Sequence, residues 1–142
     1  MKIIKNYKNI DKSDRGSVIA IGNFDGIHNG HKALISNIAE LSKTMGKKTG
    51  ICTFNPHPKN FFANGQAINQ ITTQELKYEI LEKLGIDILY EIEFNHELSR
   101  MSPDEFFNNI LIDGLGVSHV TVGSDFKFGH KRSGNSSYLR MQ

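Results

Sequence analysis

Two histidines three residues apart, His28 and His31, are the side chains in this sequence best placed to do chemistry. They follow a glycine-rich turn, and the turn follows an apolar run at residues 17–21. A strand, such a turn and a helix start together present free backbone N–H groups to a phosphate. An imidazole adds a hydrogen-bond donor, and a nearby phosphate favours its charged form. The pattern predicts a clamp for phosphate groups.

Each part of this pattern also has an ordinary explanation. A histidine at a helix start can be a cap or a surface residue, and glycines after a strand are common turn chemistry. The direct succession of a strand-like run, a Phe24-Asp25-Gly26 turn and His-x-Gly-His favours the functional interpretation. Asp25 could orient the turn or approach a metal ion, and we favour the turn.

The elements that must position these histidines follow from hydrophobic periodicity. Four strand-like runs alternate with helical patterns, which predicts an α/β fold with a Rossmann-like parallel sheet and helices on both faces. The predicted strands are 17–21, 49–54, 87–94 and 117–123, with a short edge strand within 1–16. The alternation after Leu89 predicts a less buried, edge-like position for 87–94.

The helical patterns have clear faces and ends. A capping box at Ser102 and Glu105, with proline between them, predicts a helix start. We expect Gly114 or Gly116 to end that helix. The predicted buried faces of the helices are Leu34, Ile38, Leu41 and Met45; Leu76, Ile80, Leu81 and Leu84; and Phe106, Phe107, Ile110 and Leu111.

Composition narrows the class of protein. A chain of 142 residues with 38% hydrophobic residues fits one domain with a core. Its net charge of +2 is too small to favour nucleic acid or an anionic membrane as a partner. The single cysteine, Cys52, excludes an intrachain disulfide and favours the cytoplasm. We expect Cys52 to be a small buried hydrophobe without a catalytic role.

A second segment of interest is Pro56-His57-Pro58, directly after the run 49–54. Two prolines around a histidine cannot continue a strand, so the chain must leave the sheet in a stiff loop at the strand's carboxyl end. Ligands bind at that edge of an open parallel sheet. The alternative is a proline-stiffened connection with no ligand.

A third segment, 123–134, is a basic, glycine-flanked turn after the run 117–123. Its charge alone favours a solvated loop. Its place at the carboxyl end of a predicted strand puts it at the same ligand-binding edge.

Together these segments resemble a known family. His28-x-Gly30-His31 resembles the signature of the nucleotidyltransferase superfamily. The Phe-Asp-Gly turn, the Pro-His-Pro segment and Gly123-Ser-Asp-Phe-Lys-Phe-Gly129 are similar to prokaryotic FAD synthetases, the adenylyltransferase module of bifunctional riboflavin kinase/FMN adenylyltransferases. Lys127 stands where the family usually has arginine, which keeps the charge and loses the bidentate fork.

The resemblance implies that ATP and FMN give FAD and pyrophosphate by direct in-line attack. It implies catalytic roles for His28 and His31, and Mg²⁺ that enters with ATP, held by substrate and water and not by a metal site of the protein. The implied nucleotide contacts are Gly22, Asn23, Phe24, Asp25, Gly26, Gly30, Gly123 and Asp125. The implied flavin contacts are Pro56, His57, Pro58, Asn60, Phe126, Lys127, Phe128, Gly129 and Arg132.

The resemblance covers residues 1–142, whereas full-length family members continue with a further strand, a Ser-Ser-Thr/Arg element and a riboflavin kinase domain. We therefore expect a C-terminally incomplete FAD synthetase domain without kinase activity, and a free sheet edge that favours self-association. Two alternatives stay open. One is another enzyme of the superfamily, such as a pantetheine-phosphate adenylyltransferase or a cytidylyltransferase. The other is a nucleotide- or flavin-binding fragment without catalysis.

Overall fold

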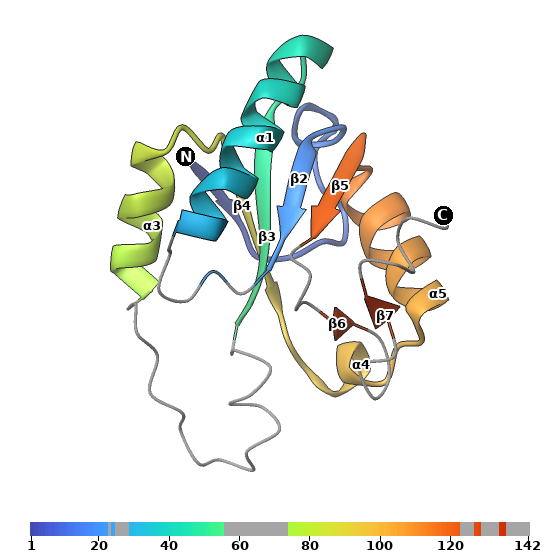
Figure 1. The fold of residues 1–142 in the computed structure, drawn as a ribbon. Coiled ribbons are helices and arrows are strands. Elements are labelled where there is room, and N and C mark those ends of the chain that lie inside the picture. Colours follow the sequence, from blue (N-terminus) through green and yellow to red (C-terminus); the bar gives the residue numbers. More distant parts are fainter. Residues whose placement is uncertain (23, 25–28, 56–73, 123–126, 129–133, 136–142) are drawn as a thin grey trace.

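A five-stranded parallel sheet forms the centre of the computed structural model (Figure 1). The structure describes residues 1–22, 24, 29–55, 74–122, 127–128 and 134–135. The sheet strands are β1 (Lys2–Ile4), β2 (Val18–Ile21), β3 (Thr49–Asn55), β4 (Ile88–Glu93) and β5 (His119–Val122). The helices are η1 (Lys12–Asp14), α1 (Asn29–Met45), α3 (Gln74–Lys83), α4 (His96–Ser99), α5 (Pro103–Glu105) and η2 (Phe106–Leu115). Two short strands, β6 (Lys127–Phe128) and β7 (Gly134–Asn135), pair with each other.

The strand order is β1-β4-β3-β2-β5, and each of these neighbours is parallel. The chain moves outward from β2 to β3 and β4, then crosses back to place β5 on the other side of β2. The predicted Rossmann-like sheet is confirmed. The reversal of direction lies between β2 and β5, where such folds bind ligands.

Two hydrophobic clusters cover the two faces of the sheet. On one face Val18, Ala20 and Leu89 pack with residues of α1 and α3. On the other face Ile19, Ile21 and Ile92 pack with residues of α4 and η2. Adjacent residues of one strand thus serve opposite layers, as the pleat requires. The helices lie on both faces, as predicted (Figure 1).

The position predicted for the third strand is wrong. β4 is an inner strand, with β1 on one side and β3 on the other, and only its last residue, Glu93, is exposed. The alternation that suggested an edge comes from Glu91, which is polar and yet buried. β1 is an edge strand, as predicted for the N-terminal segment, and β5 forms the other edge.

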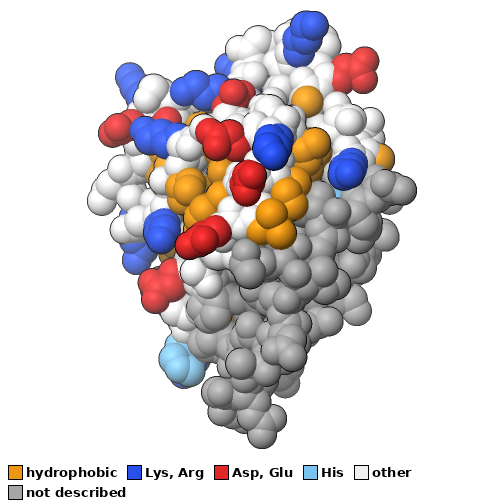
Figure 2. All heavy atoms as spheres, turned by 90° about the vertical axis from the view of Figure 1, so that its left-hand side faces the viewer, with side chains coloured by type: hydrophobic (Ala, Val, Ile, Leu, Met, Phe, Trp, Pro, Cys, Tyr) orange, Lys and Arg blue, Asp and Glu red, His pale blue; other side chains and the backbone are white. Residues whose placement is uncertain are grey.

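The predicted helix faces are confirmed in part. Ile38 and Leu81 are buried, but Met45 is 41% exposed and Leu76 is 45% exposed. Lys77 is buried in place of Leu76. Figure 2, which faces the side covered by α3, shows hydrophobic side chains at the surface between charged ones.

The last crossover begins at the predicted capping box and ends at Gly116. The Ser102 hydroxyl accepts from the Glu105 N–H at 3.1 Å, and the Glu105 carboxylate accepts from the Ser102 N–H at 3.3 Å. From Phe106 the helix widens into the π-helix η2, which periodicity did not predict. Gly116 ends it in the left-handed region, with φ +58°, where glycine avoids strain.

A polar cluster closes the amino end of the sheet. The Tyr90 hydroxyl donates to the Asp14 carbonyl at 2.6 Å and accepts from the Ser17 hydroxyl at 2.9 Å. All three residues are buried. The Arg15 guanidinium donates to the carbonyls of Ile112, Asp113 and Gly114, at the carboxyl end of η2. These bonds attach the segment before β2 to the crossover before β5.

Candidate active site

The turn after β2 has a fixed geometry at the two positions described. The Gly22 N–H donates to the Cys52 carbonyl at 3.1 Å, and a Cβ on Gly22 would lie 3.0 Å from the Phe24 ring. Glycine at position 22 thus leaves room for the Phe24 ring, so the group that approaches it closely is a side chain of the protein and not a ligand. Phe24 has the positive φ of this turn, 53°, and its ring is 1% exposed. A buried ring stabilises a backbone conformation that phenylalanine rarely adopts.

His31 lies in the first turn of α1, and its ring packs on Phe24. The two ring centroids are 5.0 Å apart, with 48° between the planes. His31 is half-buried. The contact fixes the imidazole beside the helix N-terminus, whose free N–H groups and dipole favour an anion. The first four residues of α1, Asn29 to Lys32, include no acidic side chain that would neutralise this field.

The start of α1 lies at the carboxyl edge of the parallel sheet. α1 begins after β2, and β2 lies between β3 and β5. The helix start therefore lies at the carboxyl edge, next to the reversal of strand order. The predicted strand before the histidine segment and the predicted helix start after it are confirmed, whereas most of the turn between them lies outside the described residues.

Of the predicted site residues, Gly22, Phe24, Gly30 and His31 are described, and the Phe24 ring contacts both Gly22 and His31. Their roles in binding or catalysis stay predictions. The other predicted residues stay predictions. Lys127 and Phe128 form β6, and nothing is described of their side chains. Outside the described residues lie Asn23, Asp25, Gly26, His28, Pro56, His57, Pro58, Asn60, Gly123, Asp125, Phe126, Gly129 and Arg132.

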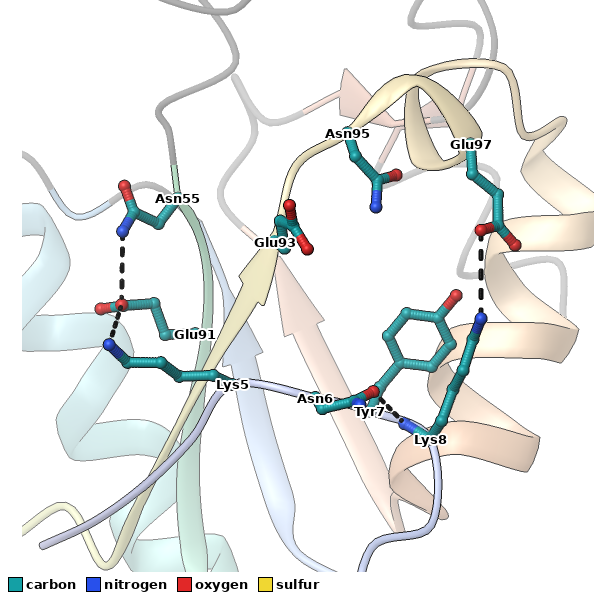
Figure 3. Close-up of a pocket in the computed structure, with 9 residues that line it drawn as sticks. All are labelled: Lys5, Asn6, Tyr7, Lys8, Asn55, Glu91, Glu93, Asn95 and Glu97. Atoms are coloured by element: carbon teal, nitrogen blue, oxygen red, sulfur yellow. Dashed lines mark hydrogen bonds and ion pairs between the residues drawn. The ribbon is translucent and has the colours of Figure 1, made fainter.

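A pocket of about 490 Å³ opens at the same carboxyl edge, over β1, β3 and β4 (Figure 3). Its lining residues are all polar or aromatic: Lys5, Asn6, Tyr7, Lys8, Asn55, Glu91, Glu93, Asn95 and Glu97. Figure 3 shows Glu93 at the tip of β4, with Asn55, Glu91 and Lys5 on one side and Asn95, Glu97 and Lys8 on the other. None of these nine residues is among the site residues predicted from the sequence.

Glu91 is the buried centre of one side of this pocket, with its side chain 2% exposed. Its Oε2 accepts from the Gln74 amide at 2.8 Å and from the Tyr78 hydroxyl. Its Oε1 accepts from the Asn55 amide at 3.5 Å, and the Lys5 ammonium lies 3.9 Å away. Burial, followed by the hydrogen bond to Glu91, raises the pKa of Tyr78 to about 12, so the phenol keeps its proton.

The opposite side of the pocket is more open. Lys8 and Glu97 approach to 4.0 Å, with both side chains more than half exposed. Asn95 accepts from the Leu98 N–H at 2.9 Å and so caps α4. Burial, followed by the charge of Glu97, raises the pKa of Tyr7. The sequence holds a signal for this pocket, because glutamate at 91 interrupts an apolar strand, but the same alternation also fits an exposed edge strand.

Comparison with known proteins identifies the family. The model of the FAD synthetase family matches residues 10–142, which is nearly the whole chain. This chain belongs to the FAD synthetase family.

The names of the relatives in this family combine two enzyme activities. The chain is 38% identical over 140 residues to the bifunctional riboflavin kinase/FMN adenylyltransferase of Buchnera aphidicola subsp. Schizaphis graminum, covering 99% of this chain and 45% of the relative. It is 37% identical over 128 residues to the protein of that name from Listeria monocytogenes, covering 89% of this chain and 40% of the relative. The chain therefore spans less than half the length of these relatives.

A solved structure has the same fold. A crystal structure described as a macrolide-efflux protein from Streptococcus pneumoniae superposes with a TM-score of 0.80 at 25% identity. The match covers 98% of this chain and 45% of that one. Within the described part of this chain, no helix is long and apolar enough to cross a membrane.

Proposed function

We propose that this FAD synthetase domain transfers AMP from ATP to FMN, giving FAD and pyrophosphate. The observation that carries the proposal is the N-terminus of the 17-residue helix α1, with His31 in its first turn held on the buried Phe24 ring. This arrangement lies at the edge where parallel sheets bind nucleotides. The names of the relatives support FMN as the acceptor.

The proposed reaction is a direct displacement at phosphorus. An oxygen of the FMN phosphate forms a bond to the α-phosphorus of ATP, while the bond from that phosphorus to the bridging oxygen breaks. The electron pair of the broken bond leaves with pyrophosphate. The FMN phosphate is already anionic, so no general base is needed. Catalysis then consists of positioning the substrates and stabilising the charge that develops on the phosphate oxygens.

His31, the start of α1 and, by the family pattern, His28 supply that stabilisation. The helix N-terminus provides fixed N–H groups, and each imidazole can donate to a phosphate oxygen. The Phe24 contact limits the rotation of His31 and so reduces the entropy lost when it binds the transition state. Mg²⁺ would enter with ATP and neutralise phosphate charge. Such an ion would be held mainly by phosphate oxygens and water.

We place FMN on the side of the turn toward β3 and β4. Asn55 lines the pocket there, and it directly precedes the Pro56-His57-Pro58 segment that the family pattern assigns to the flavin. We place the reaction in the cytoplasm, which agrees with a single cysteine kept as a buried thiol. Self-association through a free sheet edge stays a prediction, which light scattering of the purified chain would test.

The deciding experiment incubates the purified chain with FMN, ATP and Mg²⁺ and separates the flavins by chromatography. We expect FAD and pyrophosphate in equal amounts. Replacing FMN with pantetheine phosphate should give no adenylylated product. Binding of FMN and ATP without FAD would contradict the proposal and favour a nucleotide- or flavin-binding protein without catalysis.

A further inference from the structure

Two residues of the turn after β2 pack in sequence toward His31. We infer that Gly22 and Phe24 are positioning residues, which act on the reaction through His31 and not through the nucleotide. Gly22 leaves room for the Phe24 ring, and the ring fixes the His31 imidazole. The inference rests on the proposed function and goes beyond it, because the resemblance to the family implies direct nucleotide contacts for both residues.

The first step of the argument concerns what Gly22 can offer to a ligand. Its N–H donates to the Cys52 carbonyl of β3 at 3.1 Å, so this donor is already used within the protein. A Cβ at position 22 would lie 3.0 Å from Cε2 of Phe24 and 3.4 Å from Cδ2 and Cζ, while φ at Gly22 lies outside the left-handed region. The neighbouring ring alone therefore explains glycine at this position, without backbone strain or a bound phosphate.

The second step concerns the Phe24 ring. It is 1% exposed, so its side chain is closed off from a nucleotide, and it belongs to the buried cluster that contains Ile35 and Ile38 of α1. Its centroid lies 5.0 Å from that of the His31 ring, with 48° between the planes. The ring thus lies between the end of β2 and the first turns of α1, where it limits the positions open to the imidazole.

The third step separates positioning from simple packing. Phe24 has φ +53°, a conformation that bulky residues rarely adopt and that glycine or asparagine adopts with less strain. Strained residues persist where the surrounding structure holds them, and they cluster at functional sites. A large ring kept at such a position, directly against the imidazole proposed to act in catalysis, fits a requirement for the contact with His31 better than a requirement for buried area alone.

The test is a double-mutant cycle in the full chain. Gly22→Ala must displace the Phe24 ring by a few tenths of an ångström. Phe24→Leu removes the ring, including the Cε2 and Cζ atoms that crowd position 22. The double variant shows whether Gly22→Ala acts through the ring, because two changes on one route are not additive. The measurements are kcat, the KM for ATP, direct ATP affinity by calorimetry, and the thermal midpoint.

Each single variant has a matched control outside the proposed site. In Gly50→Ala the new Cβ would lie 2.9 Å from the Tyr90 ring, again with φ outside the left-handed region. Phe106→Leu removes a ring that is 2% exposed, in the cluster on the opposite face of the sheet. Both controls should lower the thermal midpoint and leave kcat per folded molecule within about twofold of the unmodified chain.

A second measurement needs no turnover. The electrons of an aromatic ring shift the proton resonances of groups beside it, so the His31 imidazole signals report its position relative to the Phe24 ring. His31→Ala identifies these signals by their absence. Gly22→Ala should shift them and leave the signals of the exposed His119 in place.

We expect Gly22→Ala to lower kcat about fivefold and Phe24→Leu about 30-fold, with ATP affinity within about twofold of the unmodified chain. Independent effects would multiply to about 150-fold in the double variant, whereas a shared route through the ring predicts about 30-fold. Should Phe24→Leu fail to fold, Gly22→Ala and the imidazole resonances decide the question.

Losses that multiply in the double variant, or an ATP affinity that falls as far as kcat in Gly22→Ala, would overturn the inference and favour direct contact with the nucleotide. An unchanged kcat or unchanged His31 resonances in Gly22→Ala would leave Gly22 and Phe24 as packing residues. Failure of the proposed function looks different, because the unmodified chain then forms no FAD. The imidazole resonances still test the contact between the three residues in that case, and their constancy in Gly22→Ala would overturn the inference as well.

Discussion

The amino and carboxyl ends of this sheet are both polar, but they are built differently. At the amino end, Tyr90 is bonded to the Asp14 carbonyl and to the Ser17 hydroxyl in a closed, buried cluster. At the carboxyl end, the carboxylate of Glu91 is also buried, but it lies at the wall of an open pocket. These two residues are neighbours on β4 and face opposite sides of the sheet.

The difference separates polar groups that stabilise the fold from polar groups that a ligand can reach. A closed cluster holds segments together and offers nothing to a ligand. A half-open cluster beside a helix N-terminus holds segments together and also leaves polar groups accessible. Substitutions at the amino end should therefore change the free energy of unfolding, and those at the carboxyl end should change binding and turnover.

The largest expected effect is on catalysis. His31→Ala should lower kcat by about 10² to 10³, because it removes a donor placed for the charge of the transition state. ATP affinity should fall much less, and His28→Ala should behave alike. The measurement is FAD formation alongside direct ATP binding.

His119→Ala is the matched control for His31→Ala, because His119 is an exposed histidine at the amino end of β5. It should retain full activity. Equal losses of kcat and ATP affinity in His31→Ala would refute a role specific to the transition state.

The next effect belongs to the amino end. Tyr90→Phe should lower the free energy of unfolding by about 1–3 kcal/mol, because it removes the hydroxyl that satisfies the buried Ser17 side chain and the Asp14 carbonyl. Urea unfolding measures this loss. Turnover per folded molecule should stay unchanged, and a selective loss of activity would break the division between the two ends.

A third prediction concerns Cys52, which is buried in the inner strand β3. Burial raises the pKa of the Cys52 thiol from 9.0 to about 12. Between these values the unfolded chain loses the proton and the folded chain keeps it, so the free energy of unfolding falls as pH rises. One proton contributes at most about 1.4 kcal/mol per pH unit. Cys52→Ala should make the decline above pH 9 shallower in urea unfolding, and an unchanged slope would contradict it.

The smallest effect is expected at Arg15. Arg15→Gln should lower the free energy of unfolding by about 1 kcal/mol. The loss is small because these carbonyls are at least partly exposed, so water can replace the lost guanidinium donors. Thermal unfolding with and without FMN separates stability from binding. The FMN-induced shift should equal that of the unmodified chain.

Much of the fold could be predicted because local signals agree with the global arrangement. The apolar run before Gly22 and the capping box at Ser102 each specify an element without reference to the rest of the chain. The succession of strand, turn and helix around His31 was predictable for the same reason, since its parts are adjacent in sequence.

What sequence could not supply depends on distant partners. Glu91 resembles an outward-facing residue until Gln74, Tyr78 and Asn55 are brought to it, so β4 was wrongly assigned to an edge. Leu76 fits the apolar pattern of α3, yet the packing of α3 on the sheet buries Lys77 instead. The periodicity of residues 106–115 likewise does not predict the π-helix η2, whose last carbonyls bond to Arg15 from before β2.

The hydrogen bonds around Gly116 set the register of β5 against β2 before β5 begins. The Gly16 N–H donates to the Gly116 carbonyl, and the Ser118 N–H donates to the Ser17 carbonyl, both at 2.9 Å. With those rungs in place β5 cannot slide along β2, and Val122 ends opposite Ile21. The carboxyl end of β5 therefore lies level with the carboxyl end of β2. Two backbone hydrogen bonds at the amino ends of β2 and β5 thereby fix which residues of the two strands lie side by side at the carboxyl edge of the sheet.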